Sequence, residues 1–316
     1  MKKKLTYGCI LAVLILATAL WGASDYMLDY SLRPDNRGKD MNGSWRYMRE
    51  TYPALMGWTD SLEKHNGLRD TFITAPDGVR MHAFYIRSVR PARQTAIIVH
   101  GYTDNAIRMF HIGYLYHHHL GYNILLPDLR YTGLTGGDAI QMGWLDRKDV
   151  LQWIATAPAL FGDSLTAVVH GISMGAATTM MVSGEETVPG FVKCYVEDCG
   201  YTSVWDQFKK ELKEQFGLPA FPLLYTASQL CEVRFGWNFK EASSLRQVEK
   251  CTRPMLFIHG DRDDYVPTWM VGPLYEAKPA PKERWIVPGA DHAMSYRLYP
   301  EEYTRRVKAF VDRYNR

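Results

Sequence analysis

Apolar residues follow two alternating patterns along most of the chain: short continuous runs, and longer segments with the spacing of an amphipathic helix. The short runs lie at residues 95–101, 122–128, 165–171, 191–199, 253–260 and 284–289. The helical segments lie at residues 105–120, 145–155, 174–183 and 300–314. Strands that are apolar throughout belong to parallel sheets, because crossover helices cover both faces of such a sheet. The pattern therefore predicts an α/β fold with a mostly parallel central sheet and flanking helices.

Three segments depart from this alternation. Residues 71–88 contain two alternating strands around Pro76-Asp77-Gly78, which predicts a hairpin. Residues 25–68 mix aromatic and charged side chains at loosely helical spacing and predict an N-terminal helical arm. Residues from about 201 to 250 are rich in Phe, Leu, Pro and Tyr, and we expect them to form a small helical cap within a domain that covers residues 69–316.

Residues 1–24 have the composition of a signal peptide or a membrane anchor. Three lysines precede a run from Leu5 to Ala23 that contains no charged side chain. Nineteen helical residues span about 28 Å, close to the roughly 30 Å of a bilayer's hydrocarbon core. Small residues near Ala19 suit cleavage, and Trp21 suits an interfacial anchor, so both interpretations stay open. We expect either a membrane-anchored protein with its catalytic domain outside the cytoplasm or a secreted one.

Charge and cysteine content exclude several other classes. The formal net charge is +3, and it becomes 3 − 3 = 0 when the lysines of residues 2–4 are set aside, so nucleic acid is not an expected partner. Beyond Cys9, the cysteines lack the paired spacing of a zinc site and the density of a disulfide scaffold. We expect buried free thiols at Cys194, Cys199, Cys231 and Cys251, with one disulfide that involves Cys231 as the alternative.

The segment Gly171-Ile172-Ser173-Met174-Gly175 joins an apolar run to a stretch of small helix-forming residues. This is the Gly-x-Ser-x-Gly pattern of a nucleophile elbow, in which a strained turn exposes the serine hydroxyl. A serine nucleophile needs a general base and a carboxylate that orients the base. The segments "IHGDRDDYVP" and "VPGADHAMSY" supply an aspartate and a histidine after two later strands, in the chain order Ser, Asp, His.

With these motifs, the chain from about Thr71 to the C-terminus resembles the α/β hydrolases of the serine esterase and lipase kind. The matching segments include "VHGYTDN", "LPDLRYTGLTGG", "HGISMG", "HGDRDDYVP" and "GADH". The resemblance implies an α/β-hydrolase fold with a small cap, with Ser173 as nucleophile, Asp263 as acid and His292 as base. It also implies an oxyanion hole made by the backbone amides of Tyr102 and Met174.

Other polar residues admit a second interpretation. Some lipases of this superfamily take their acid from the end of the preceding strand, which makes Asp198 the alternative to Asp263, although a loop-anchoring role is expected for it. Consecutive helical residues point about 100° apart, so the run at 117–119 of three histidines is not expected to bind a metal. We expect Asp128 and Arg130 to hold their loop, and we expect no metal and no cofactor.

The sequence predicts a serine hydrolase that cleaves carboxylic esters through an acyl-enzyme. The apolar cap segment "FGLPAFPLLYTASQL" favours short-chain or aryl esters, so the expected partner is a small-molecule ester. The membrane is a second expected partner if residues 1–24 are retained. An exported serine peptidase or aminopeptidase is one alternative, with Trp205, Glu211 or Glu214 as the substrate anchor. A non-catalytic cell-envelope binding protein on the same scaffold is the other.

Overall fold

Eight strands form one sheet in the order β1-β2-β4-β3-β5-β6-β7-β8. The structure is a computed structural model that describes residues 2–34 and 36–316. The strands are β1 Arg69–Thr74, β2 Arg80–Ile86, β3 Gln94–Val99, β4 Asn123–Pro127, β5 Thr166–Ile172, β6 Val192–Asp198, β7 Met255–Gly260 and β8 Lys282–Val287. β1 and β2 pair as the predicted antiparallel hairpin, β2 is antiparallel to β4, and all other neighbours are parallel. The predicted fold class is therefore confirmed.

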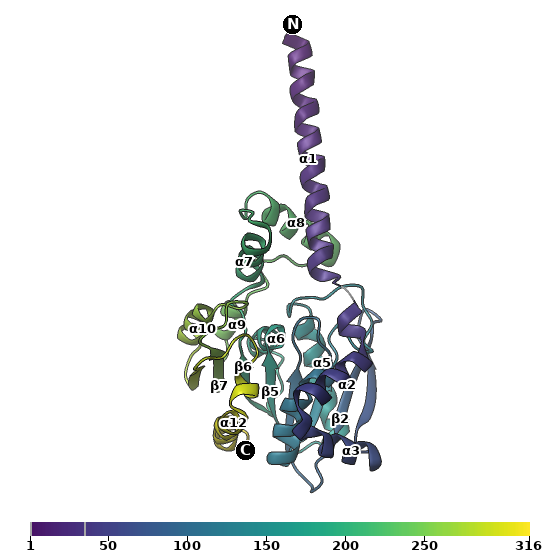
Figure 1. Cartoon of the computed structure of the whole chain (residues 1–316), viewed down its shortest axis with the longest axis vertical. Coiled ribbons are helices and arrows are strands. Elements are labelled where there is room, and N and C mark those ends of the chain that lie inside the picture. The colour runs from purple at the N-terminus through teal and green to yellow at the C-terminus, as the bar shows by residue number, and fades with distance from the viewer. Residues whose placement is uncertain (1, 35) are drawn as a thin grey trace.

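Helices cover both faces of this sheet (Figure 1). The α-helices of the described residues are α1 Lys2–Leu32, α2 Met41–Thr51, α3 Met56–Lys64, α4 Phe110–Tyr114, α5 Asp146–Phe161, α6 Met174–Ser183, α7 Val204–Phe216, α8 Leu223–Phe235, α9 Ser244–Val248, α10 Val271–Ala277, α11 Ser295–Leu298 and α12 Pro300–Tyr314. The predicted helix over residues 105–120 consists of a 3₁₀ turn at Ala106–Met109, α4 and a π-helical turn at Leu115–His119. Hydrophobic spacing does not distinguish these three windings, so the sequence pattern predicted one helix.

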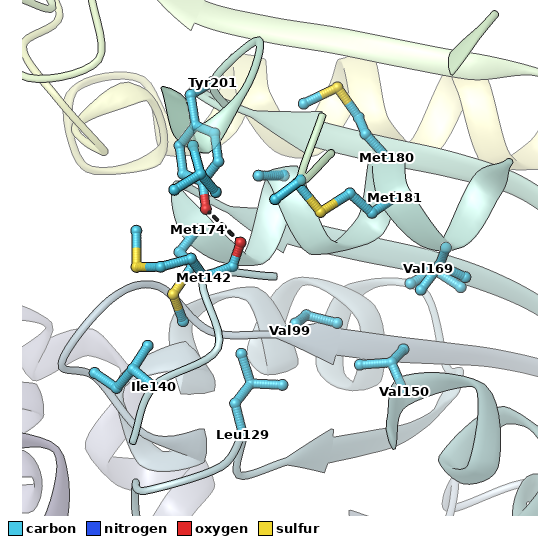
Figure 2. Close-up of a cluster of buried hydrophobic side chains, with 14 of the residues drawn as sticks. Val99, Leu129, Ile140, Met142, Val150, Val169, Met174, Met180, Met181 and Tyr201 are labelled. Atoms are coloured by element: carbon cyan, nitrogen blue, oxygen red, sulfur yellow. Dashed lines mark hydrogen bonds between the residues drawn. The ribbon is translucent and has the colours of Figure 1, made fainter. Parts of the chain in front are cut away.

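The core lies in two layers, one on each face of the sheet. Successive side chains of a strand point to opposite faces, and along β3 Ile97 and Val99 enter one layer whereas Ala96 and Ile98 enter the other. Beneath the turn between β5 and α6, Met174, Met180 and Met181 pack in the first layer with Tyr201 (Figure 2). The Tyr201 hydroxyl donates to the carbonyl oxygen of Met142 at 2.9 Å, so the base of this turn is fixed by packing and by a buried hydrogen bond.

Two helices of the 201–250 segment, α7 and α8, stand apart from the sheet beside α1 (Figure 1). The hydroxyl of Ser203 accepts a hydrogen bond from the backbone N–H of Asp206 at 3.0 Å and caps α7. Gly217 ends α7 and Gly236 ends α8, both in the left-handed conformation that glycine adopts without steric penalty. The two helices are thus defined by local capping signals in their own sequence.

Helix α1 runs without interruption from the apolar N-terminal segment into the domain. Its apolar part projects away from the other elements (Figure 1) and is long and apolar enough to cross a membrane by length and composition. Its last turns are packed, because Leu28 and Leu32 are buried in the core. Arg234 of α8 also pairs with Asp25 at 2.6 Å and with Asp29 at 2.8 Å. The expected boundary at residue 24 therefore falls inside one helix.

The cysteines of the domain are free thiols. Cys194, Cys199, Cys231 and Cys251 are all buried and none is in a disulfide. Burial raises the pKa of Cys194, because a thiolate would lose its hydration there. The interpretation as buried thiols is confirmed for this part of the chain, and the alternative disulfide at Cys231 is not formed.

Candidate active site

Ser173 lies on a sharp turn between β5 and α6. Its backbone has φ 58° and ψ −120°, a strained conformation for a residue with a side chain. A Cβ atom at Gly171 would lie 2.0 Å from the carbonyl oxygen of Gly175. A Cβ atom at Gly175 would lie 2.1 Å from the carbonyl oxygen of Val99. The turn therefore forms only with glycine at both positions, which is why this sequence pattern specifies it.

The three residues predicted to act together meet at the carboxyl ends of the strands. Nε2 of His292 lies 2.8 Å from Oγ of Ser173, and Nδ1 of His292 lies 2.7 Å from Oδ2 of Asp263. Because the carboxylate accepts the proton on Nδ1, Nε2 is left to accept the hydrogen bond from the serine hydroxyl. The ring of Tyr265 packs against the imidazole, with ring centroids 4.9 Å apart. The arrangement is a hydrogen-bonded chain of acid, base and hydroxyl.

The carboxylate of Asp263 is fixed by more than His292. Its Oδ1 accepts a hydrogen bond from the backbone N–H of Val266 at 2.9 Å, and Nε2 of His259 lies 3.4 Å from its Oδ2. Burial alone would raise the pKa of Asp263, but hydrogen bonds from His259 and His292 outweigh burial and lower the pKa to about 2. The carboxylate is therefore charged throughout the pH range in which esters are assayed.

His259 is a neighbour of the site that sequence reasoning missed. His100, His170 and His259 each directly precede a glycine at a strand end, a position that predicts a packing or hydrogen-bonding role. His100 bonds the Leu129 amide at 2.9 Å, and His170 lies 3.0 Å from the Tyr303 hydroxyl. His259 bonds the carbonyl oxygen of Val266 and also lies beside the carboxylate of Asp263. The sequence signal for this second contact was the position of His259, four residues before Asp263.

Asp198, the alternative acid, contacts a different partner. Its Oδ1 accepts a hydrogen bond from Oγ of Ser295 at 3.1 Å, and its carbonyl oxygen accepts one from the backbone N–H of Ser173 at 2.8 Å. Burial raises the pKa of Asp198 to about 6. The geometry therefore favours Asp263 as the partner of His292, and Asp198 anchors the loops on either side of the site.

The raised pKa of Asp198 predicts a pH-dependent stability. A carboxyl group that binds its proton more tightly when folded stabilises the native state below its unfolded pKa of about 4, and this contribution is lost as the pH rises through 6. Relative to Asp198→Asn, the wild type should therefore lose on the order of 2–3 kcal/mol of unfolding free energy between pH 4 and pH 8. Denaturant unfolding at both pH values measures the difference, and an equal difference at the two pH values contradicts the prediction.

Tyr102 and Met174, whose backbone amides are the predicted oxyanion donors, line the same cavity as Ser173. Met174 is the first residue of α6, so its N–H belongs to the helix N-terminal donors that have no partner within the helix. Tyr102 follows β3, and its side chain does not simply pack on the cap, because its hydroxyl donates to the carbonyl oxygen of Ser31 at 2.8 Å. The loop that carries the Tyr102 amide is thus tied to the end of α1.

A buried thiol lies beneath the same residues. The ligand atoms of Cys199, Asp263 and His292 lie within 4.8 Å of one another. Burial raises the pKa of the Cys199 thiol well above its usual value, so the sulfur stays protonated and is a poor metal ligand. The carboxylate and the imidazole are already bonded to each other. The structure thus gives these three groups a hydrogen-bonded acid–imidazole pair beside a protonated thiol.

Ser173 and His292 open into a cavity of about 740 Å³. Its walls include Phe216 and Leu224 of the predicted apolar cap segment, as well as Met27 and Leu28 of α1. The wall contributed by α1 had no signal in the sequence, because that segment reads as a targeting sequence followed by an arm. The functional site therefore includes the N-terminal helix.

Two groups of residues considered from the sequence lie outside the site. His117 accepts from the Trp58 indole N–H at 3.0 Å, whereas His118 and His119 both pack against the ring of Tyr114. Asp128 accepts from the backbone N–H of Ala106 at 2.8 Å, and Arg130 bonds Asp149 at 2.6 Å. The prediction that this aspartate and this arginine hold their loop is confirmed.

The chain is similar to proteins of one hydrolase superfamily. The prolyl oligopeptidase family matches residues 114–316, which include Ser173, Asp263 and His292. The uncharacterized protein YqkD of Bacillus subtilis (strain 168) is 32% identical over 221 residues, which cover 70% of this chain and 72% of YqkD.

Solved structures agree on the fold. The esterase Pf2001 of Pyrococcus furiosus has a TM-score of 0.65 at 23% identity, over 81% of this chain and 96% of its own. The esterase domain of a Rhodothermus marinus protein has a TM-score of 0.56 at 20% identity, over 79% and 100% of the two chains. The α/β hydrolase GrgF of Penicillium sp. sh18 has a TM-score of 0.59 at 15% identity, over 78% and 98%. The chain has the α/β-hydrolase fold and belongs to the prolyl oligopeptidase family of serine hydrolases.

Proposed function

We propose that the protein hydrolyses carboxylic esters with Ser173 as nucleophile, His292 as general base and Asp263 as the carboxylate that orients the base. One observation carries the proposal: the hydrogen-bonded chain from Asp263 through His292 to Ser173, whose hydroxyl borders an apolar cavity. A buried, charged carboxylate on Nδ1 holds the imidazole in the tautomer that accepts the serine proton.

The reaction has two halves. In the first, the oxygen of Ser173 bonds to the acyl carbon as its proton moves to Nε2 of His292, and the amides of Tyr102 and Met174 donate to the developing oxyanion. The bond to the leaving alcohol then breaks, and His292 returns the proton to that alcohol. In the second half, water gives a proton to His292 and attacks the acyl-enzyme, which releases the acid and restores the serine.

The cavity suits a small apolar substrate. Leu28, Met142 and Leu212 contribute to its walls together with the aromatic rings of Phe216 and Phe239. Apolar walls with a few convergent polar groups bind uncharged organic molecules. Short-chain or aryl esters are therefore the proposed substrates.

Peptide substrates form the second candidate, favoured by the family match and by one cap residue. Glu211 lines the cavity, whereas Trp205 packs on Tyr225 and Glu214 pairs with Lys210. The carboxylate of Glu211 could anchor a substrate amine, but it also accepts hydrogen bonds from Lys210 at 3.0 Å and from Gln207 at 3.1 Å. These contacts within α7 give Glu211 a structural role that does not require a peptide.

Turnover of matched ester and amide substrates distinguishes the two candidates. The substrates are p-nitrophenyl esters of two to twelve acyl carbons and a panel of aminoacyl p-nitroanilides. We expect the highest kcat/KM for a short ester, and we expect the kcat/KM of every amide to be lower than that value by at least about 100-fold. Faster turnover of an amide would assign the protein as a peptidase. A fluorophosphonate probe should label Ser173, and folded protein without that adduct would instead support the non-catalytic binding protein.

The N-terminal helix serves as a membrane anchor in this proposal, with the catalytic domain outside the cytoplasm. The lysines at residues 2–4 suit the cytoplasmic end of a span, in line with the positive-inside rule. The continuity of α1 from its apolar part to the cavity wall supports retention over cleavage and secretion.

A further inference from the structure

Exposed aromatic residues of α1 and of the cap form two sets of ring contacts, which we together call the aromatic rim: Tyr26, Tyr30 and Phe216 in one, Phe221 and Tyr225 in the other. Their ring centroids lie 6.3 Å apart for Tyr26 and Tyr30, 5.7 Å for Tyr30 and Phe216, and 5.9 Å for Phe221 and Tyr225. Phe221 has 73% of its surface exposed, the most of the five. Leu218, between α7 and α8, is also exposed.

The aromatic rim lies at the end of the domain from which α1 projects. Figure 1 shows the connection between α7 and α8 at this end, beside the helix. The hydroxyl of Tyr30 donates to Oε1 of Gln215 at 3.1 Å, and Arg234 bonds Asp25 and Asp29. These contacts tie the cap to the turns of α1 that directly follow its apolar run.

Two residues of the aromatic rim also line the active-site cavity. Tyr30 and Phe216 belong to its wall and are 49% and 40% exposed, so they border both the cavity and the outside. Leu223 at the start of α8 lines the same cavity. A molecule that reaches Ser173 from this side of the cavity passes the rings of Tyr30 and Phe216.

A lipid interface fits this surface better than water or a protein partner. Tyr26 lies three residues after Ala23, the last residue of the apolar run, and this separation is roughly 5 Å along a helix. If α1 spans a bilayer, Tyr26 therefore lies at the level of the head groups, where aromatic side chains are enriched. Phe221 lies in the connection between α7 and α8, which stands beside α1 (Figure 1), and its exposed ring would otherwise leave apolar surface in water.

We propose that the aromatic rim inserts into the head-group region of the bilayer that α1 spans, and that the cavity takes its ester substrate from that interface. The inference rests on the proposed function and names its substrate class: uncharged esters that partition into a membrane interface. Apolar burial at the interface holds the cap in place, and the cavity mouth then faces the layer in which such esters concentrate.

Fluorescence of a labelled rim residue tests the contact without requiring activity. The variants Phe221→Cys and Leu218→Cys, each in a Cys9→Ser background, are labelled with NBD, because the remaining four cysteines are buried. Val89→Cys is the matched control: Val89 is an exposed apolar residue between β2 and β3, at the opposite edge of the sheet from the site. The full-length proteins are reconstituted in phosphatidylcholine–phosphatidylglycerol (3:1) vesicles with and without head-group spin-labelled lipid.

We expect quenching of at least about twofold at positions 221 and 218 and none at position 89. Equal signals at all three positions would overturn the proposal. A blue shift at 221 that depends on protein concentration and shows no lipid quenching would overturn it in favour of contact with a second copy.

A kinetic comparison tests the delivery of substrate. The double variant Leu218→Ser, Phe221→Ser changes two residues that do not line the cavity. It should raise the apparent KM for a vesicle-embedded butyrate ester of an apolar phenol about threefold to tenfold and leave turnover of soluble p-nitrophenyl acetate unchanged. An unchanged KM would overturn delivery from the interface. Absence of ester turnover in the wild type, with quenching intact, would refute the proposed function and leave the membrane contact standing.

Discussion

Replacement of Ser173 by alanine is expected to lower ester turnover by about four to six orders of magnitude. In the proposed mechanism the hydroxyl oxygen forms the acyl-enzyme, so its loss leaves His292 without a nucleophile to activate. The free energy of unfolding should change by no more than about 1 kcal/mol, because the substitution removes one hydrogen bond and keeps the strained backbone. Stopped assays with a short aryl ester and thermal unfolding measure the two effects.

A second serine of the same helix provides the control. Ser183 ends α6, is also buried and donates to the carbonyl oxygen of Met180 at 2.7 Å. Ser183→Ala should keep turnover within about twofold of wild type while changing stability by a similar small amount. Residual activity of Ser173→Ala above about 1% of wild type, after contamination is excluded by fluorophosphonate titration, would refute the assignment of the nucleophile.

The parts of the site that follow from short local patterns were predictable. A Cβ at Gly171 or Gly175 would collide with backbone oxygens, so five residues specify the turn at Ser173. The acid and the base could be located because parallel strands end at the same edge of a sheet, and each residue directly follows such a strand. The hairpin around Pro76, Asp77 and Gly78 was predictable for the same reason, since its turn residues determine its geometry.

The parts that depend on contacts between distant segments were not predictable. Nothing in the sequence near Ser31 indicates that its carbonyl oxygen receives the Tyr102 hydroxyl across 71 residues. Likewise, Leu28 and Leu32 belong to the predicted N-terminal arm, but no sequence signal indicates that they fill the core of the domain. The amphipathic face of α1 becomes visible only when α8 and the cavity wall are in place. Burial at such positions is a property of the tertiary arrangement and leaves no local periodicity.

The two aspartates near the site have opposite electrostatic environments, and exchange of each for asparagine separates their roles. Asp263→Asn should lower kcat by about 10³- to 10⁴-fold, because the amide favours the His292 tautomer whose Nε2 carries a proton and cannot accept one from Ser173. Asp198→Asn keeps the His292 contact to Asp263 and should lower kcat by less than about tenfold, because it replaces only the acceptor of the Ser295 hydroxyl.

Stability as a function of pH gives an independent readout of the same exchange. The pKa of Asp263 is lowered to about 2, so its carboxylate stabilises the native state above its unfolded pKa of about 4, and this contribution is lost as the pH falls toward 2. The wild type should therefore exceed Asp263→Asn by about 2 kcal/mol at pH 7 and converge with it near pH 2, the reverse of the trend for Asp198→Asn. Urea unfolding of the three proteins across this range measures both trends. If Asp198→Asn were the variant that lost activity and Asp263→Asn kept it, Asp198 would be the acid of the triad and the hydrogen bond from His292 to Asp263 would be a structural contact.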